Sequence, residues 1–258
     1  MNSISVEIAG RVYRATNTAL DISIPLRFDT TQLQAYGAPA AQAETYAIGN
    51  FIGDVARGGS CNCQRYHITP HCNGTHTESV GHVTRDAHAV NALAQSGLML
   101  ARLITVDPAT QASGDRVIRL QDMQSTANPD LTTSALIVRT LPNTTDKLTR
   151  NYDAGNPPAY FEPTVLAWLA EIGIEHLLVD VPSVDRMDDG GHLLAHRAFW
   201  GLPAGETFAA HAQRPQATIT ELIYVPTEIS DGDYLLSLQL APFVSDATPS
   251  RPLLFPLI

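Results

Sequence analysis

The sequence predicts an α/β fold in a single domain, residues 1–258. Short apolar runs alternate with turn residues, and a helix with one apolar face lies between two of these runs. Strand, helix and strand in that order are typical of an α/β sheet. A chain of 258 residues with 44% hydrophobic content is also long enough to bury a full core.

Four runs are interpreted as buried sheet strands because each is short, apolar and bounded by Asp, Gly, Pro or Arg. They cover residues 103–106, 135–138, 176–179 and 234–238. The helix lies between the second and third runs, where Pro163 suits a first turn and Gly173 supplies the stop. Its apolar face consists of Val165, Leu166, Leu169 and Ile172.

Charge and composition exclude several classes of partner. The formal net charge is −10, and the cations are fifteen Arg and the single Lys147, without a polybasic run for nucleic acid or anionic lipid. Residues 1–14 lack a basic start followed by an apolar core, and no apolar stretch approaches the roughly 20 residues that span a bilayer. Three cysteines do not make a disulfide framework. We therefore expect a cytoplasmic protein that binds neither nucleic acid nor a membrane surface.

The main chemical clue is a cluster of histidines in the first third of the chain. His67, His71, His76 and His82 fall in one short stretch, beside Cys72 and Glu78. Imidazole, thiolate and carboxylate are the side chains that bind zinc and related transition metals. In an extended segment, the residues at even positions from 72 to 82 would share a face, apart from the turn that a glycine permits. The competing interpretation is a polar loop whose histidines only satisfy backbone groups.

The stretch 72–82 resembles the signature of the cyclase family, which includes kynurenine formamidases and isatin hydrolases. That signature is His-x-Gly-Thr-His-x-Asp, with a further His four residues after the Asp. His76, in its Gly-Thr-His context, and His82 match the pattern. Glu78 stands where the family has Asp, and Cys72 stands at the first His position.

Further motifs follow in the family's order and extend the resemblance over residues 20–258. An Asp-Ile-Ser-Ile-Pro-Leu run resembles the family's opening motif, and a strand ends in Arg-Thr. An Asp-x-x-Ser-x-Asp element precedes an Ala-His-Arg-Ala element, and a Glu-containing strand precedes a final hairpin. These motifs cover residues 21–26, 136–140, 180–185, 195–198, 219–222 and 231–234.

The resemblance implies a swivelling β/β/α fold that forms a homodimer or homotetramer, with one or two Zn²⁺ ions, or Mn²⁺ as the alternative. By position, the ligands it implies are Cys72, His76, Glu78, His196 and Glu221. His82 corresponds to the family's proton-transfer residue. His71 directly precedes Cys72 and replaces it as a ligand if the loop shifts by one residue.

The function implied is metal-dependent hydrolysis of a carbon–nitrogen bond other than a peptide bond, or of a lactone-like bond. Substrates of this family include formamides and cyclic amides, often aromatic. Residues 28–53 would form much of the entrance, and they lack a Trp-Pro-Gly-Asp type of sequence. The alternative is a non-catalytic metal-binding scaffold or small-molecule binding protein on the same fold. A proton-transfer residue such as His82 favours the enzyme.

Four other residues have weaker interpretations. Cys61 and Cys63 flank one residue of an expected strand, and we expect both to be buried as small apolar side chains. Arg139 and Asp180 end two strands. They either orient the substrate or the ligands, or they form an internal ion pair or cap.

Overall fold

The computed structural model describes residues 3–93, 97–126 and 133–258. Within these residues, eight strands form one sheet. The first seven close into a ring, because the first and the seventh strand also pair with each other, and the eighth strand pairs with the seventh at the edge. In the order of the sheet, the strands are β18 (Gly232–Leu240), β10 (Met99–Val106), β13 (Ala135–Thr140), β16 (His176–Val179), β17 (Thr218–Glu221), β9 (His76–Glu78), β19 (Ala247–Pro256) and β3 (Leu20–Asp21).

The four runs predicted as strands all lie in this ring, so the α/β prediction is confirmed. Strands β10, β13, β16 and β17 run parallel, whereas β9, β18 and β19 pair antiparallel with their neighbours. The predicted helix is present as α3 (Pro163–Glu171), which leads from β13 to β16. It begins at Pro163 and is followed by Gly173 at φ 86°, a left-handed conformation that glycine adopts without strain.

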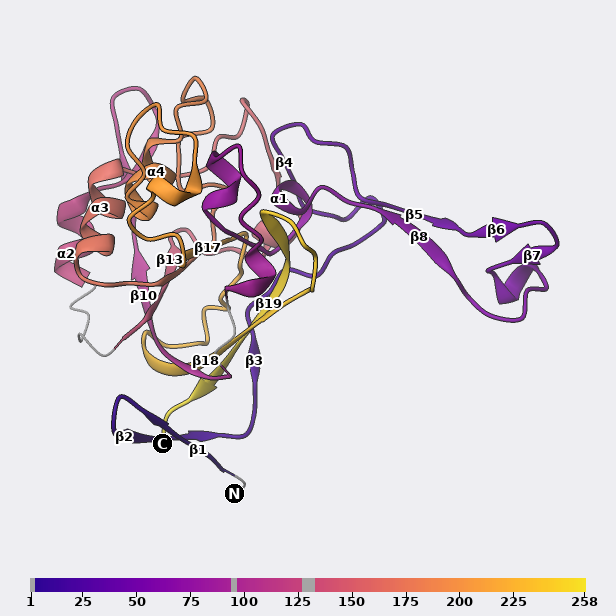
Figure 1. The fold of residues 1–258 in the computed structure, drawn as a ribbon, viewed down its shortest axis with the longest axis horizontal. Helices are drawn as coiled ribbons and strands as arrows, with labels where there is room; N and C mark the ends of the chain where they lie inside the picture. The colour runs from indigo at the N-terminus through magenta and orange to yellow at the C-terminus, as the bar shows by residue number, and fades with distance from the viewer. Residues whose placement is uncertain (1–2, 94–96, 127–132) are drawn as a thin grey trace.

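Helices cover one side of the ring, as Figure 1 shows for α2 (Leu120–Thr126), α3 and α4 (Leu194–Trp200). Side chains alternate along a strand, so each strand contributes to two cores. Ile104 and Leu177 belong to the core that includes the helices, and Leu103 and Leu178 belong to a second core. The parallel strands are therefore buried on both faces, as their continuous apolar runs indicate.

A long arm extends away from the body in Figure 1. It is built from two short antiparallel ribbons, β5 (Gln42–Thr45) with β8 (Gln64–His67) and β6 (Ala47–Ile48) with β7 (Phe51–Ile52). Cys61 and Cys63 are exposed in the arm between β7 and β8. Our expectation of buried cysteines in a strand is wrong, since a two-stranded ribbon has no core in which to bury them.

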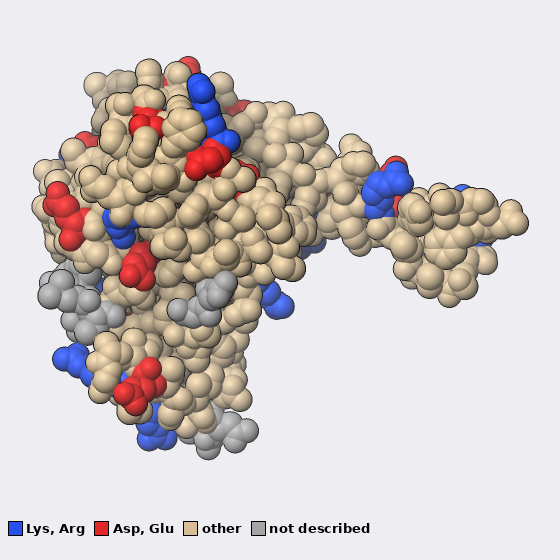
Figure 2. Space-filling view, in the orientation of Figure 1, with Lys and Arg blue, Asp and Glu red and all other residues tan. Residues whose placement is uncertain are grey.

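The remaining elements connect these parts. They are the hairpin strands β1 (Ser3–Ile8) and β2 (Arg11–Thr16), the short strands β4 (Gln34–Ala35), β11 (Ala109–Thr110), β12 (Arg116–Ile118), β14 (Asn151–Tyr152) and β15 (Tyr160–Phe161), the helix α1 (Pro70–Asn73), and the 3₁₀ turns η1 (Val55–Arg57), η2 (Val80–Val83), η3 (Val90–Ala92), η4 (Thr145–Leu148) and η5 (Ala209–His211). No helix among the described residues is long and apolar enough to cross a membrane. On the face in Figure 2, charged side chains are scattered rather than gathered.

Candidate metal centre

Two neighbouring strands of the ring supply three of the polar side chains in the centre. His76 pairs across the ladder with Glu221, the last residue of β17, and Glu78 lies two residues further along β9. Because alternate residues of a strand face the same side, His76 and Glu78 enter the centre together. His76 and Glu78 are completely buried, and Glu221 is 3% exposed.

Helix α4 adds His196 to this group. Its Nε2 atom lies 2.9 Å from Oε1 of Glu78 and 3.5 Å from Oε1 of Glu221. The Nε2 atom of His76 lies 3.5 Å from Oε2 of Glu221. The fold thus brings together His76, Glu78, His196 and Glu221, although their sequence positions spread from 76 to 221.

Outer contacts fix the orientation of these side chains. Asp185 Oδ2 lies 2.6 Å from Nδ1 of His196, and the carbonyl oxygen of Gly74 lies 3.1 Å from Nδ1 of His76. Both imidazoles therefore turn Nε2 toward the carboxylates, an arrangement common among metal-binding histidines. The backbone N–H of Val184 donates to Oε1 of Glu221 at 2.9 Å and holds that carboxylate in place.

Several buried polar atoms in the centre lack a hydrogen-bond partner within the described residues. They include Nε2 of His76, Nε2 of His196 and both carboxylate oxygens of Glu78. The 2.9 Å approach of His196 to Glu78 is close, but its geometry is not that of a hydrogen bond. Buried charges in proteins are normally paired or coordinate a metal. A set of two imidazoles and two carboxylates fits a divalent transition metal such as zinc.

Electrostatics in the centre also favour a cation. Burial opposes the charged form of His196, but Glu78, Asp185 and Glu221 together outweigh it and raise its pKa well above the usual value. Burial likewise opposes ionisation of Glu221, yet His196 and His76 lower the pKa of its carboxyl. The carboxylates of Glu78 and Glu221 are thus held ionised beside the imidazoles of the centre. A bound metal ion would take the place of the protons there.

A second group of side chains adjoins the first. The Nε2 atom of His71 lies 3.2 Å from Oδ2 of Asp246 and 3.5 Å from Oε2 of Glu78. The His71 ring stacks on that of His82, with centroids 4.5 Å apart. The Nδ1 atom of His82 is 3.7 Å from a carboxylate oxygen of both Glu78 and Asp246. The nearby imidazoles of His71 and His82 lower the pKa of the Asp246 carboxyl.

Comparison with known proteins identifies the family. The model of the Cyclase family matches residues 20–186, which is more than half of the chain. The chain belongs to the cyclase family. No curated protein matches it in sequence.

Solved structures share the cyclase fold at low sequence identity. An isatin hydrolase bound to the product analogue thioisatinate is 13% identical with a TM-score of 0.66, covering 93% of this chain and 92% of the other. Isatin hydrolase A from Labrenzia aggregata, bound to benzyl benzoate, is 15% identical with a TM-score of 0.63, covering 93% and 94%. A structure described as a potential metal-dependent hydrolase with cyclase activity is 15% identical with a TM-score of 0.61, covering 93% and 98%. The fold expected from the resemblance is therefore confirmed.

The residues of the cyclase signature do not all lie in one strand. Cys72 lies in α1 and His82 lies in η2, so only His76 and Glu78 share a strand face as expected. The thiol of Cys72 belongs to no group of converging ligand atoms in the described part of the chain, whereas His71 does. Burial and the charge of Glu221 raise the pKa of the Cys72 thiol. Ligation by Cys72 stays a prediction, and the geometry favours its neighbour His71.

Arg139 and Asp180, for which the sequence allowed two roles, form ion pairs within this cyclase-family fold. Arg139 pairs with Asp231 at 2.8 Å, and Asp180 pairs with the buried Lys147 at 2.7 Å. Both pairs tie strand ends to neighbouring loops. Asp246, by contrast, lies in the centre but carries no sequence signal, since only the pairing of β19 with β9 brings it there.

A cavity of about 320 Å³ opens beside the centre. Glu221, His71 and His82 line it, together with Tyr36 from the expected entrance segment 28–53. Apolar side chains, including Met187 and Leu193, line another part of its wall. The cavity can therefore hold a small, partly apolar molecule against the cluster.

Proposed function

We propose that this chain is a metal-dependent hydrolase that cleaves a formamide, a cyclic amide or a lactone-like bond of a small substrate. The metal is zinc, with manganese as the alternative, held by His76, Glu78, His196 and Glu221. The observation that carries the proposal is the convergence of buried ligand atoms without hydrogen-bond partners beside a cavity, whose wall includes Glu221. Membership of the cyclase family supports it, and so does the description of the structural neighbours as hydrolases.

The protein's own residues prepare this chemistry. A zinc ion bound here would lower the pKa of a water molecule from about 15.7 to about 7 and would polarise the substrate carbonyl. Asp185 holds the His196 ring, and the Val184 N–H holds Glu221, so the ligands need not reorganise. The cavity's apolar wall, which includes Leu193, positions the substrate.

His82 is the candidate proton-transfer residue. Its side chain is 26% exposed and lines the cavity, while Asp246 and Glu78 lie 3.7 Å from its Nδ1 atom. An imidazole in that position can pass a proton to the departing nitrogen or oxygen of the substrate. A purely metal-binding scaffold has no use for such a group beside the cavity.

Metal analysis combined with a substrate screen tests the proposal. The purified protein should contain stoichiometric zinc or manganese, and it should hydrolyse at least one class among aryl formamides, isatin-like rings and lactones. Chelation should abolish that hydrolysis, and adding zinc back should restore it. Retained metal without turnover of any class would favour the non-catalytic scaffold. Full turnover by a verified metal-free sample would contradict the mechanism.

A further inference from the structure

Tyr36 occupies a backbone conformation that tyrosine rarely adopts. It follows β4, and its φ of 59° and that of Gly37 at 64° are both left-handed. The N–H of Ala38 donates to the carbonyl of Ala35 at 3.1 Å, so Tyr36 and Gly37 are the central residues of a tight turn. Gly, Asn and Asp dominate turns with two positive φ angles, since other residues are strained there.

Neighbouring contacts force this conformation on Tyr36. Ala35 is completely buried in a small core with Leu33 and Tyr152. The N–H of Tyr36 donates to the carbonyl of Tyr152 at 3.1 Å, which continues the pairing of β4 with β14. The Tyr36 side chain lies outside that core, and the residue is 42% exposed. Core packing therefore does not explain why a tyrosine stands at this strained position.

The Tyr36 side chain lines the cavity beside the metal centre. Glu221, Cys72 and Ser183 line the same cavity. Ser183 is 7% exposed, and its Oγ accepts the N–H of Asp185 at 3.1 Å. Asp185 in turn holds His196. Tyr36 and the loop that positions the centre thus line the same cavity.

The cavity beside the centre has two chemically different groups of side chains. One consists of His71 and His82, which lie against Asp246. The other consists of hydroxyl and thiol groups from Tyr36, Ser183 and Cys72. Burial and the negative charges of Glu221 and Glu78 raise the pKa of the Tyr36 phenol, so it keeps its proton at neutral pH. It is a hydrogen-bond donor next to carboxylates that can only accept.

We propose that Tyr36 is a catalytic residue that donates a hydrogen bond to the substrate's carbonyl oxygen and to the negative charge that develops on it during hydrolysis. This inference rests on the proposed hydrolase function. A preorganised donor aimed at such an oxygen stabilises the transition state more than the ground state. The strained turn fixes the donor before the substrate arrives, as strain at functional sites commonly does. Substrates without an acceptor oxygen on that side would be poor ones.

Tyr36→Phe in the zinc-loaded protein tests the inference, because it removes only the hydroxyl. It should lower kcat/KM about 10²-fold on whichever of formanilide, isatin or dihydrocoumarin the parent hydrolyses, the scale for losing one such donor. Zinc content and the unfolding temperature should stay at the parent values. Tyr66→Phe is the matched control, since Tyr66 is 55% exposed on the arm and, within the described residues, its hydroxyl donates a hydrogen bond only to Gln64. It should behave like the parent.

Binding of acetohydroxamate, a metal-chelating probe with an acceptor oxygen, gives a readout that does not require turnover. Calorimetry should show roughly 10-fold or weaker binding to Tyr36→Phe than to the parent, the scale of a hydrogen bond to a charged group. Equal affinity, or equal kcat/KM, would overturn the role of Tyr36 while leaving the hydrolase proposal intact. Conversely, a zinc-loaded parent that hydrolyses none of the three substrates contradicts the proposed function, and the hydroxamate affinities still decide whether Tyr36 is a donor.

A second variant separates function from structure. Tyr36→Gly should lose as much activity as Tyr36→Phe, yet unfold at no lower temperature than Tyr36→Phe, because glycine adopts a φ of 59° without strain. Loss of zinc together with a lower unfolding temperature in both variants would mean that Tyr36 only supports the fold, and would overturn the inference.

Discussion

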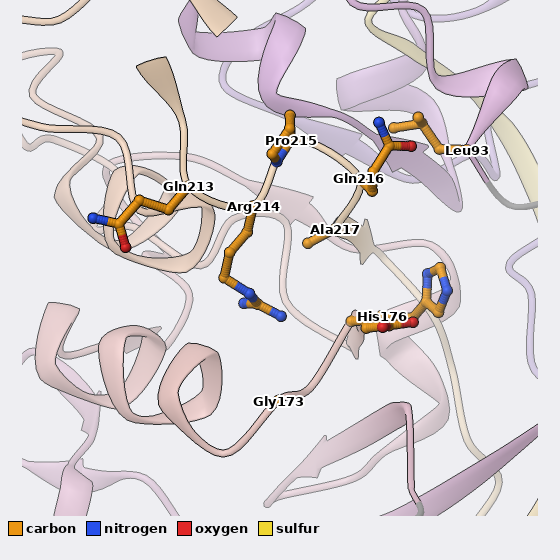
Figure 3. Close-up of a pocket in the computed structure, with 9 residues that line it drawn as sticks. Leu93, Gly173, His176, Gln213, Arg214, Pro215, Gln216 and Ala217 are labelled. Carbon is orange, nitrogen blue, oxygen red and sulfur yellow. The ribbon is translucent and has the colours of Figure 1, made fainter. Parts of the chain in front are cut away.

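The two ends of the parallel strands hold polar side chains in opposite states. At the carboxyl ends, Glu78 and the Nε2 atoms of two histidines are buried without hydrogen-bond partners. At the amino ends of β16 and β17 lies a larger cavity, of about 410 Å³, with His176 and Arg214 on its wall (Figure 3). There Nδ1 of His176 lies 2.9 Å from Oγ1 of Thr218, and Arg214 donates to two backbone carbonyls.

This contrast shows that cavity size does not identify the functional end. The His176 and Arg214 side chains of the larger cavity are already used to hold strands and loops together. The polar groups of the smaller one are left open, at a cost that only a ligand can offset. Ligand sites in open α/β sheets also lie outside the carboxyl ends of the strands, which is the end at which the candidate centre of this ring lies.

The largest effect should come from Glu78, because one of its carboxylate oxygens lies near His196 and the other lies near His71 and His82. Glu78→Gln keeps the shape but removes the charge, so metal content should fall and kcat/KM should drop by more than the roughly 10- to 100-fold typical of losing a mere outer partner. Metal analysis and kinetics measure both. Glu175→Gln at the opposite end is the matched control and should change neither. Similar losses in the two variants would remove the distinction between the ends.

The second effect concerns His82, which lies beside the candidate metal centre. His82→Ala should retain the metal and lose hydrolysis by roughly 10²-fold or more, the scale of removing a general acid–base group. Metal content measured on the assayed sample decides the interpretation. Loss of the metal with the activity would make His82 a ligand, which its position near Glu78 and His196 geometrically allows.

A smaller effect distinguishes His71 from Cys72. His71→Ala should weaken metal retention about 10-fold, as expected for a residue at the edge of the cluster, and Cys72→Ala should stay close to the parent. Competition with a chelator after identical purification gives the ranking. The reverse ranking would establish Cys72 as the ligand. In that case Cys72→His should preserve much of the metal, because thiolate and imidazole both reach zinc at about 2.0–2.3 Å.

The sequence was most informative where local rules act alone. Buried parallel strands require continuous apolar runs, and α3 carries its own start and stop signals, so these elements could be placed in advance. His76 and Glu78 share a face because of strand alternation, which needs no tertiary information. The approach of these residues to His196 and Glu221 was expected only from family resemblance.

Contacts that depend on long-range pairing could not be predicted from the sequence. Asp246 reaches the centre only because β19 pairs with β9, and nothing around it in the chain marks a ligand. The left-handed Tyr36 depends on the pairing of β4 with β14. The sequence also could not predict that Cys61 and Cys63 are exposed. A strand-like pattern does not show that the segment lies in an arm that extends away from the core.

The smallest expected effect on activity lies at the amino end, in His176→Gln. Burial lowers the pKa of His176, so the folded protein resists protonation there. As the pH falls below about 6.5, the unfolded chain binds a proton that the folded chain does not, and stability falls by at most about 1.4 kcal/mol per pH unit. This contribution is complete above pH 6.5 and is lost progressively as the pH falls toward the lowered pKa of His176 in the folded protein.

Glutamine has no such proton, so the unfolding temperature of the parent should fall more between pH 7 and pH 5 than that of the His176→Gln variant. Turnover at pH 7.5 should be equal in both, because the side chain at this end only holds Thr218. Parallel unfolding curves would contradict the buried neutral histidine, and a loss of turnover would place function at the end of the strands where the polar groups are already satisfied.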